Sequence, residues 1–300
     1  MISIIGSGRV GSSIAFLCVS NALDDVLLIN RNKDKAIGES LDIANAIPST
    51  SKFSIRGTDD YSKLVDSTVV VIAASVESYT TDRTENITSQ VIMIKEIAEK
   101  IKHYCPSAIV LLISNPLDVL TYFFQKETGF SRYKVIGVAS SLDASRFRYF
   151  ISEKFSVQQS SITDAMVLGE HGDSMVPVFS NCFVDGIPLL SMLDDNQKNS
   201  ITNDVRNYWK ILRSHKSRSH FGIAKNTYDV IDSITNAKEL SISASLVLEG
   251  EYGESDVAMG VPVKINQNGV IEIQKIELDE FEQNSLKISA QTIRNNIQSI

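Results

Sequence analysis

The chain has 300 residues, of which 43% are hydrophobic and 22% charged, and its formal net charge at pH 7 is −7. This length and composition are typical of a globular protein with one large or two medium domains. The negative charge disfavours a general affinity for nucleic acid or anionic membranes, and no apolar run reaches the ~18 residues of a membrane span. The three cysteines are odd in number and far apart, so we expect free thiols, no metal site and a reducing cytoplasm.

Short apolar runs alternate with helical stretches in the first half of the chain. The expected strands are residues 2–5, 26–29, 53–56, 69–73, 109–113 and 135–138, and residues 87–102 are the clearest helix between them. Continuous β-branched runs are typical of strands that are covered on both faces. Repeated β-α alternation therefore predicts an α/β fold with a doubly wound parallel sheet, the Rossmann arrangement.

The second half has a different pattern. We expect strands at 161–168 and 178–184, helices at 203–212 and 221–235, and an antiparallel set at 242–248, 257–263 and 270–273. A turn at 266–269 joins the last two strands, and an amphipathic helix closes the chain. This predicts a dinucleotide-binding domain over residues 1–140 and an α+β substrate domain over residues 141–300.

A GxGxxG motif directly follows the first expected strand and opens a helix. Its residues are Gly6, Ser7, Gly8, Arg9, Val10 and Gly11. The first glycine permits a tight turn, the second lets the backbone approach a pyrophosphate, and the third allows close packing of helix and strand. The helix N-terminus offers free N–H groups to phosphates. The motif alone is common in loops, so its position between strand and helix carries the prediction of a dinucleotide site.

The second strand ends at Asn30, at the spacing where such domains usually have an acidic residue that binds the 2′-OH of the ribose and repels a 2′-phosphate. Asn30 is neutral and is followed by Arg31. We therefore expect that NADP is accepted as well as NAD, and that it is favoured. The alternative is that Arg31 is a solvated loop charge and that Asn30 still binds the ribose of NAD.

Four residues in three segments suit one reaction. Asp143 and Arg146 share a face of an expected helix, His171 lies between glycines after an apolar run, and Arg83 lies in a polar stretch after the fourth strand. Singly, each has an ordinary interpretation as an ion pair, a structural histidine or a surface charge. Together they can supply a proton carrier, its carboxylate partner, a bidentate clamp for a substrate carboxylate and a loop arginine that polarises a carbonyl. Hydride transfer to a 2-oxo acid needs this set.

Five motifs follow one another along nearly the whole chain. They are GSGRVG at 6–11, ISNPLD at 113–118, LDASRFR at 142–148, GEHGDSMVP at 169–177 and GEYGESDVAMGVPVKI at 250–265. With them the sequence resembles the lactate/malate dehydrogenase family, and within it the lactate-dehydrogenase-like malate dehydrogenases. The resemblance implies that His171 is the acid/base, Asp143 its partner, Arg146 the carboxylate clamp and Arg83 the catalytic loop arginine. Family members are usually dimers or tetramers.

The resemblance also implies further contacts. Asn115 is expected to touch both the nicotinamide ribose and the substrate, and its bond to Pro116 is expected to be cis. Gln90 stands where the family usually has a cofactor-contacting Asn, and Ile113 is grouped with the cofactor site. Ser219 matches a Ser or Thr of the substrate pocket.

The loop that sets substrate choice departs from the family pattern. Malate enzymes usually have an arginine there and lactate enzymes a glutamine, whereas this chain has Glu77 or Ser78. A glutamate facing the pocket would repel oxaloacetate. Because residues 213–220 are unusually basic, we hypothesise that Arg218 or His220 supplies the missing positive charge. The alternative is a solvated helix end.

The sequence thus predicts an oxidoreductase, in the first place a malate dehydrogenase that uses NAD or NADP. One alternative is a lactate or broader 2-hydroxy-acid dehydrogenase, favoured by the absent loop arginine. A non-enzymatic alternative is a dinucleotide-binding regulatory protein on the same fold. The presence of Asp143, Arg146, His171 and Arg83 together opposes that alternative, since a binding module needs only the glycine-rich half.

Overall fold

The computed structural model describes residues 1–76 and 83–300, and it describes residues 83–85 by their backbone alone. The strands of the first half are β1 (Ile2–Ile5), β2 (Val26–Ile29), β3 (Ile55–Thr58), β4 (Val69–Ile72), β5 (Ile109–Leu112) and β6 (Val135–Gly137). They pair in parallel in the order β3-β2-β1-β4-β5-β6. This is the strand order of the doubly wound dinucleotide-binding fold, whose crevice opens at the carboxyl ends of the strands. The expected Rossmann sheet is confirmed.

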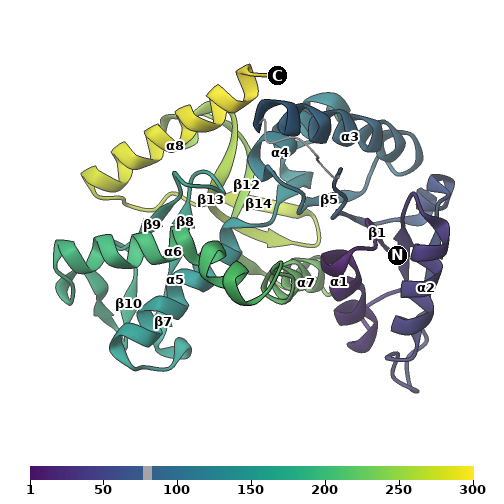
Figure 1. Cartoon of the computed structure of the whole chain (residues 1–300), viewed down its shortest axis with the longest axis horizontal. Coiled ribbons are helices and arrows are strands. Elements are labelled where there is room, and N and C mark those ends of the chain that lie inside the picture. The colour runs from purple at the N-terminus through teal and green to yellow at the C-terminus, as the bar shows by residue number, and fades with distance from the viewer. Residues whose placement is uncertain (77–82) are drawn as a thin grey trace.

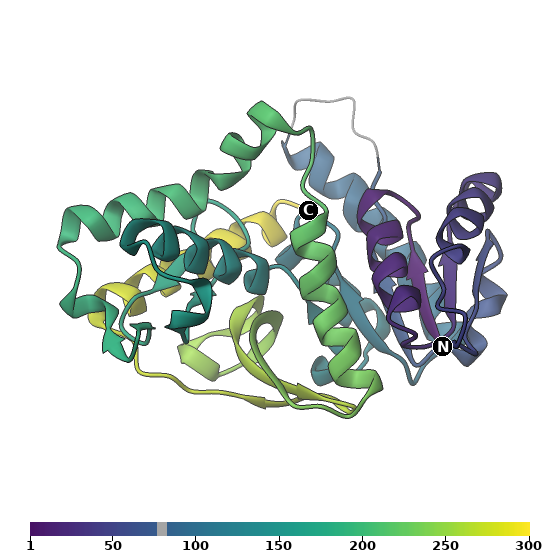
Figure 2. The same cartoon turned by 90° about the horizontal axis from the view of Figure 1, so that it is seen from below.

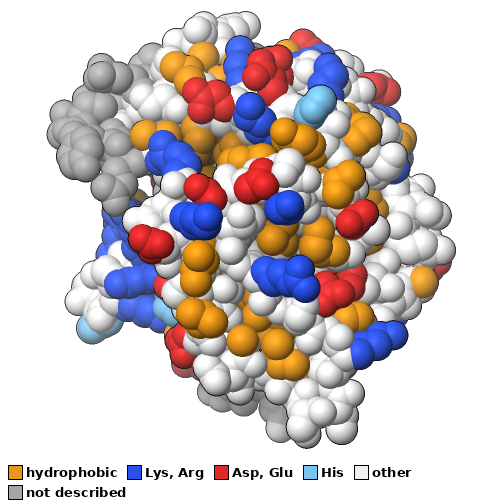
Figure 3. All heavy atoms as spheres, turned by 90° about the vertical axis from the view of Figure 1, so that its right-hand side faces the viewer, with side chains coloured by type: hydrophobic (Ala, Val, Ile, Leu, Met, Phe, Trp, Pro, Cys, Tyr) orange, Lys and Arg blue, Asp and Glu red, His pale blue; other side chains and the backbone are white. Residues whose placement is uncertain are grey.

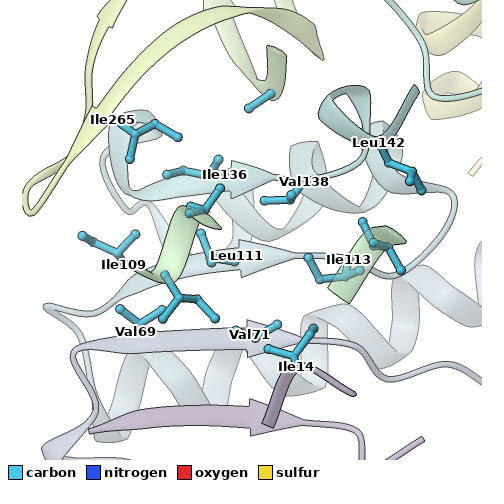
Figure 4. Close-up of a cluster of buried hydrophobic side chains, with 14 of the residues drawn as sticks. Ile14, Val69, Val71, Ile109, Leu111, Ile113, Ile136, Val138, Leu142 and Ile265 are labelled. Carbon is cyan, nitrogen blue, oxygen red and sulfur yellow. The ribbon is translucent and has the colours of Figure 1, made fainter. Parts of the chain in front are cut away.

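Helices cover both faces of this sheet (Figure 1). They are α1 (Arg9–Ser20), α2 (Lys33–Ala44), α3 (Arg83–Tyr104) and α4 (Leu117–Thr128). Val69 and Val71 of β4 lie in the same core cluster as Ile14 of α1 (Figure 4). Val70 and Ile72 belong to a second cluster, which contains the apolar side of α3. Because both faces are covered, β4 is apolar at every position.

The second half extends the main sheet and adds helices beside it (Figure 2). Its helices are α5 (Ser140–Phe155), α6 (Asp195–His215), α7 (Phe221–Thr235) and α8 (Glu280–Gln298), and its long strands are β12 (Leu240–Glu249), β13 (Ser255–Asn266) and β14 (Gly269–Ile273). These strands form the expected antiparallel set, and β12 also pairs with β6 through Ser245 and Gly137. Across the described residues the main sheet thus has nine strands, and the core continues from one half into the other.

Short elements connect these parts. Two small sheets comprise β7 (Ile162–Thr163), β8 (Met166–Leu168), β9 (Val176–Val178), β10 (Phe183–Val184) and β11 (Ile187–Pro188). The short 3-10 helices are Tyr61–Asp66, Arg132–Lys134, Gln159–Ser161, Leu189–Ser191 and Glu251–Gly253. The expected single strands at 161–168 and 178–184 are wrong. Asp164 has a left-handed backbone with φ 55°, which interrupts the extended chain between β7 and β8. In the second run, Val178 ends β9 and Phe183–Val184 form β10, so the run is not one continuous strand.

The third strand begins two residues later than expected. The carboxylate of Asp25 accepts hydrogen bonds from the backbone N–H and the hydroxyl of Ser54, at 2.7 and 2.8 Å. The ladder with β2 starts only at Ile55, which pairs with Val26. A side-chain contact between residues 29 positions apart therefore sets this boundary, and the local sequence does not reveal it.

The remaining expectations concern thiols and surfaces. Cys18, Cys105 and Cys182 are free and buried, and burial raises their pKa values to about 12, 11 and 12.

Within residues 1–76 and 83–300, no helix has the length and apolarity to cross a bilayer, and no group of metal-binding side chains comes together. On the side of the molecule that carries α2, apolar side chains lie among charges of both signs (Figure 3).

Candidate active site

The glycine-rich loop has the shape that a bound dinucleotide requires. Gly6 has a φ of +110°, and a Cβ there would lie 2.7 Å from the backbone of Ala73. A Cβ at Gly11 would overlap the carbonyl oxygen of Gly6, so the helix–strand contact also demands glycine. A Cβ at Gly8 would meet nothing within 4 Å. The protein's own packing therefore does not explain Gly8, whereas the close approach of a pyrophosphate does.

Asn30 is tied to this loop. Its Nδ2 donates to Ser7 Oγ at 2.9 Å, and its Oδ1 accepts the backbone N–H of Asn32 at 2.9 Å. Ser7 is fully buried, whereas Arg31 is exposed and forms no ion pair with the described residues. The expected ribose position thus carries a neutral amide that donates towards the loop, with a free guanidinium beside it.

The catalytic candidates meet at the start of α5. Asp143 is 1% exposed, and its Oδ2 lies 2.6 Å from His171 Nδ1. Its other oxygen accepts from Arg146 Nη1 at 2.8 Å. Since Asp143 holds a hydrogen on Nδ1, the Nε2 atom of His171 is left to exchange a proton with a substrate. The structure brings together three residues that the sequence could only group by chemistry.

The environment of His171 favours its protonated form. Burial alone would lower the pKa of His171, and Arg146 also lowers it. The charge and hydrogen bond of Asp143, followed by the charge of Asp118, outweigh these effects and leave the pKa raised above its ordinary value. A histidine in this setting can carry a proton at neutral pH and release it to a substrate oxygen.

His171 and Arg146 open onto a cavity of about 660 Å³. Asn115, Gln90, Arg218 and Ser219, which are all site residues proposed from the sequence, also line it. The Asn115–Pro116 bond is cis, as the resemblance implies. Gln90 also accepts from and donates to the backbone of Val76, at 3.1 and 2.8 Å, so it anchors the chain just before the specificity loop.

Several expected site residues lie elsewhere. Ile113 is 9% exposed and packs its side chain into the core, so only its backbone is left for a cofactor contact (Figure 4). His220 is not on the cavity wall; its Nδ1 lies 3.3 Å from Ser13 Oγ of α1. Glu77, Ser78 and the side chain of Arg83 lie outside the described residues.

Arg9 and Val10 begin α1 directly after the loop. Arg9 Nη1 donates to Ser217 Oγ at 2.7 Å, beside the contact between Ser13 and His220. Two hydrogen-bonding contacts therefore join the basic segment 216–220 to α1. They fix the position of the segment whose residues Arg218 and Ser219 line the cavity.

Helix α6 forms one side of the cavity, and its lining residues Arg206 and Trp209 were not predicted from the sequence. Arg206, Trp209 and Arg213 all line it, at a spacing of three and four residues that puts them on one helix face. Arg206 donates to the backbone oxygen of Met175 through Nε and Nη2, at 3.2 and 2.8 Å. The 3.6-residue period was the available signal, but the expected helix ended at residue 212 and excluded Arg213.

The cavity wall carries mainly positive charge. Four arginines and one acidic residue are found among its described lining residues: Arg146, Arg206, Arg213, Arg218 and Asp173. One arginine is enough to bind a monocarboxylate in bidentate fashion. The excess of positive charge suits a ligand with more than one acidic group.

Comparisons with known proteins agree along the whole chain. A family model described as lactate/malate dehydrogenase, NAD binding domain, matches residues 1–137. A second model, described as lactate/malate dehydrogenase, alpha/beta C-terminal domain, matches residues 140–300. L-lactate dehydrogenase 1 of Clostridium acetobutylicum and malate dehydrogenase of Ehrlichia chaffeensis are each 33% identical, over 100% of this chain and 98% of the relative. The crystal structure of a Cryptosporidium parvum lactate dehydrogenase, complexed with lactic acid and nicotinamide adenine dinucleotide, matches with a TM-score of 0.94 and 34% identity, over 99% of this chain and 96% of that chain. The chain therefore belongs to the lactate/malate dehydrogenase family and is an NAD-dependent 2-hydroxy-acid dehydrogenase.

Proposed function

We propose that this enzyme interconverts oxaloacetate and malate with His171 as its acid/base. The observation that carries the proposal is the arginine-rich wall of the cavity that also contains His171. Oxaloacetate has one carboxylate beside the reacting carbonyl and a second one at the far end. Arg146 accounts for the first carboxylate, and Arg213 and Arg218 are the candidates for the second.

The glycine-rich loop and Asn30 would hold the nicotinamide cofactor, which would supply the hydride for C2 of the 2-oxo acid. His171 Nε2 gives its proton to the former carbonyl oxygen, and it takes the proton back when malate is oxidised. Asp143 keeps the ring in the required tautomer and stabilises imidazolium in the reverse direction. Arg146 presents a planar guanidinium that orients the carboxylate next to the reacting carbon. Asn115 and Ser219 contact the substrate from the cavity wall, and Arg83 polarises the carbonyl, as the family resemblance implies.

Loss of Arg218 tests the assignment of the second carboxylate. In Arg218→Ala, kcat/KM for oxaloacetate should fall about 10- to 100-fold, because a hydrogen bond to a charged group contributes roughly 1.5–3 kcal/mol. The value for pyruvate should change little, because pyruvate has a methyl group at that end. Lys210→Ala is the control, since it removes one positive charge from exposed α6 surface outside the cavity lining. An unchanged ratio of the two kcat/KM values would remove Arg218 from the specificity site.

A lactate dehydrogenase is the second candidate. A lactate dehydrogenase and a malate dehydrogenase among the relatives share the same identity with this chain, and positions 77 and 78 carry no arginine. Initial rates of the wild-type enzyme with oxaloacetate, pyruvate and 2-oxoglutarate, each with NADH and NADPH, decide between the two. A higher kcat/KM for pyruvate than for oxaloacetate supports the lactate assignment.

We also propose that the enzyme accepts NADP, with a preference for it over NAD. Asn30 lacks the negative charge that repels a 2′-phosphate, and Arg31 is free to pair with one. Asn30→Asp should lower kcat/KM for NADPH by about tenfold or more, which corresponds to roughly 1.4 kcal/mol, while that for NADH changes little. The reason is that the introduced carboxylate repels the 2′-phosphate, which NADH lacks. Arg31→Ala should lower the NADPH value alone. Lys52→Ala should change neither, because Lys52 is exposed and precedes β3 near the start of β2, at the end of the strand opposite Asn30. Equal ratios in Arg31→Ala and wild type would remove Arg31 from the cofactor site.

We further propose a homodimer or homotetramer. Exposed apolar side chains on adjoining helices support it: Phe16 on α1, Leu41 on α2 and Phe221 on α7 are 47%, 65% and 69% exposed. Apolar groups of this size on neighbouring helices are typical of surfaces that become buried in an assembly.

A further inference from the structure

Asp118 is a buried carboxylate that holds the backbone of His171. It lies in the first turn of α4, is 3% exposed and does not line the cavity. Its Oδ2 accepts the backbone N–H of His171 at 2.7 Å. A carboxylate at this position cannot touch a substrate, yet it contacts the residue that exchanges the proton.

The second oxygen of Asp118 is also engaged. Its Oδ1 accepts from Ser245 Oγ of β12 at 2.7 Å. One side chain thus joins three segments, namely α4, the loop after β8 and the middle of the main sheet. Asn115 on the cavity wall precedes the same helix by two residues. The start of α4 therefore contributes one residue to the cavity wall and one, Asp118, to the backbone of His171. Burying a carboxylate costs free energy unless its oxygens accept hydrogen bonds, and both oxygens of Asp118 do so.

The charges around His171 come from three directions. Asp143 and Arg146 face it from α5, Asp118 faces it from α4, and Glu170 and Asp173 belong to its own loop. Burial raises the pKa of Asp118 to about 6, although the bonds from Ser245 and from the His171 N–H oppose that rise. Above pH 6 Asp118 is therefore mainly ionised, and its charge adds to that of Asp143 in stabilising imidazolium.

We propose that Asp118 is a positioning residue for the proton transfer: it fixes the main chain of His171 against α4 and β12 and supports the charged form of the ring. The proposal rests on the role of His171 as acid/base. The main-chain bond aims the ring at Asp143 and leaves Nε2 facing the cavity. The buried negative charge then keeps the ring protonated for reduction, so Asp118 acts on the reaction only through His171.

Two variants separate the bond from the charge. Asp118→Asn keeps an oxygen for the His171 N–H and an N–H₂ group that can donate to Ser245, but it removes the charge. We expect the pH profile of kcat/KM for oxaloacetate reduction to move to lower pH, with kcat on the acidic plateau close to that of wild type. Asp118→Ala removes the bond as well, and kcat should fall on the order of tenfold to hundredfold at every pH, as expected for a displaced catalytic group, with KM for NADH unchanged.

Two serines of β12 provide a matched pair. Ser245→Ala removes a hydrogen bond that favours ionised Asp118, so it should move the pH profile in the same direction as Asp118→Asn. Ser243→Ala removes a buried hydroxyl that has no hydrogen-bond partner in the described structure, and its profile should match wild type. Glu282→Gln removes another buried carboxylate, which contacts Phe179 and Ser180 instead of His171, and should also leave the profile in place.

Each outcome assigns a cause. A wild-type profile in both Asp118→Asn and Ser245→Ala, while His171→Asn shows the large expected loss of kcat, overturns the role of Asp118 and leaves the proposed function intact. Absence of 2-oxo acid reduction by the wild-type enzyme contradicts the proposed function itself. If Asp118→Asn does not fold, Ser245→Ala decides alone, since it retains the carboxylate. Equal shifts in Ser245→Ala and Ser243→Ala would show a general effect of β12 and also contradict the proposal.

Discussion

His171→Asn should lower kcat for oxaloacetate reduction on the order of 10²–10⁴-fold, the range that general acid catalysis contributes. Asparagine can occupy the volume of the ring and still donate to Asp143, but it cannot release a proton to an alkoxide. Binding of NADH should be unchanged, because the glycine-rich loop and Asn30 lie on a different part of the fold. Steady-state rates together with a fluorescence titration of NADH measure the two properties separately.

The control for this variant is His103→Asn, at an exposed position in the last turn of α3. It should retain wild-type kcat. Full activity in His171→Asn would remove His171 from the chemistry, whereas joint loss of activity and NADH binding would indicate a folding defect.

The pH dependence of the wild type gives a further check. Because the pKa of His171 is raised, reduction should persist at neutral pH and fall as the pH rises through that pKa, while malate oxidation should rise over the same interval.

Arg146→Lys should lower kcat/KM for every 2-oxo acid by about 10²-fold or more. Lysine keeps the charge but cannot form two parallel hydrogen bonds with a carboxylate, and each such bond contributes roughly 1.5–3 kcal/mol. The change also removes the Nη1 bond to Asp143 and the stacking of the guanidinium 4.9 Å from the ring centroid of Tyr208. Initial rates with oxaloacetate and pyruvate should therefore fall together, in contrast to the selective loss expected for Arg218→Ala.

Arg148→Lys is the matched control on the same helix, because Arg148 is partly exposed and its one hydrogen bond within the described residues is to Gln159, at 3.4 Å. It should behave as wild type. An Arg146→Lys enzyme with wild-type kcat/KM would show that the substrate carboxylate binds elsewhere in the cavity. Loss restricted to oxaloacetate would assign Arg146 to the distal carboxylate instead.

Local patterns were sufficient for the parallel sheet and the glycine-rich loop. The apolar strands need no alternation, because residues such as Val70 and Val71 are both buried, on opposite faces. Gly6 and Gly11 are required by backbone contacts within the first strand-loop-helix unit, which is short in sequence. Features fixed within about one such unit could therefore be predicted from spacing alone.

Contacts between distant residues could not be predicted in this way. Asp118 and His171 are 53 positions apart, and the ISNPLD motif showed no chemical reason to connect them. The α6 wall was missed for a related reason: Arg206 and Arg213 follow a helical period, but only the packing of α6 over the cavity makes that face functional. The sequence offered Arg218 or His220 as the source of the missing charge, and only the folded chain places His220 against α1 and Arg218 on the cavity wall.

The most direct test follows the hydride itself. The wild-type enzyme is mixed with oxaloacetate and NADH that carries deuterium at both hydrogens of the nicotinamide C4, and the product is analysed by mass spectrometry and proton NMR. We predict one deuterium on C2 of malate for each NADH consumed, and formation of the same product on the order of 10²–10⁴-fold more slowly with His171→Asn. Consumption of NADH without label on C2 of the hydroxy acid, or no turnover of oxaloacetate, would contradict the proposed reaction.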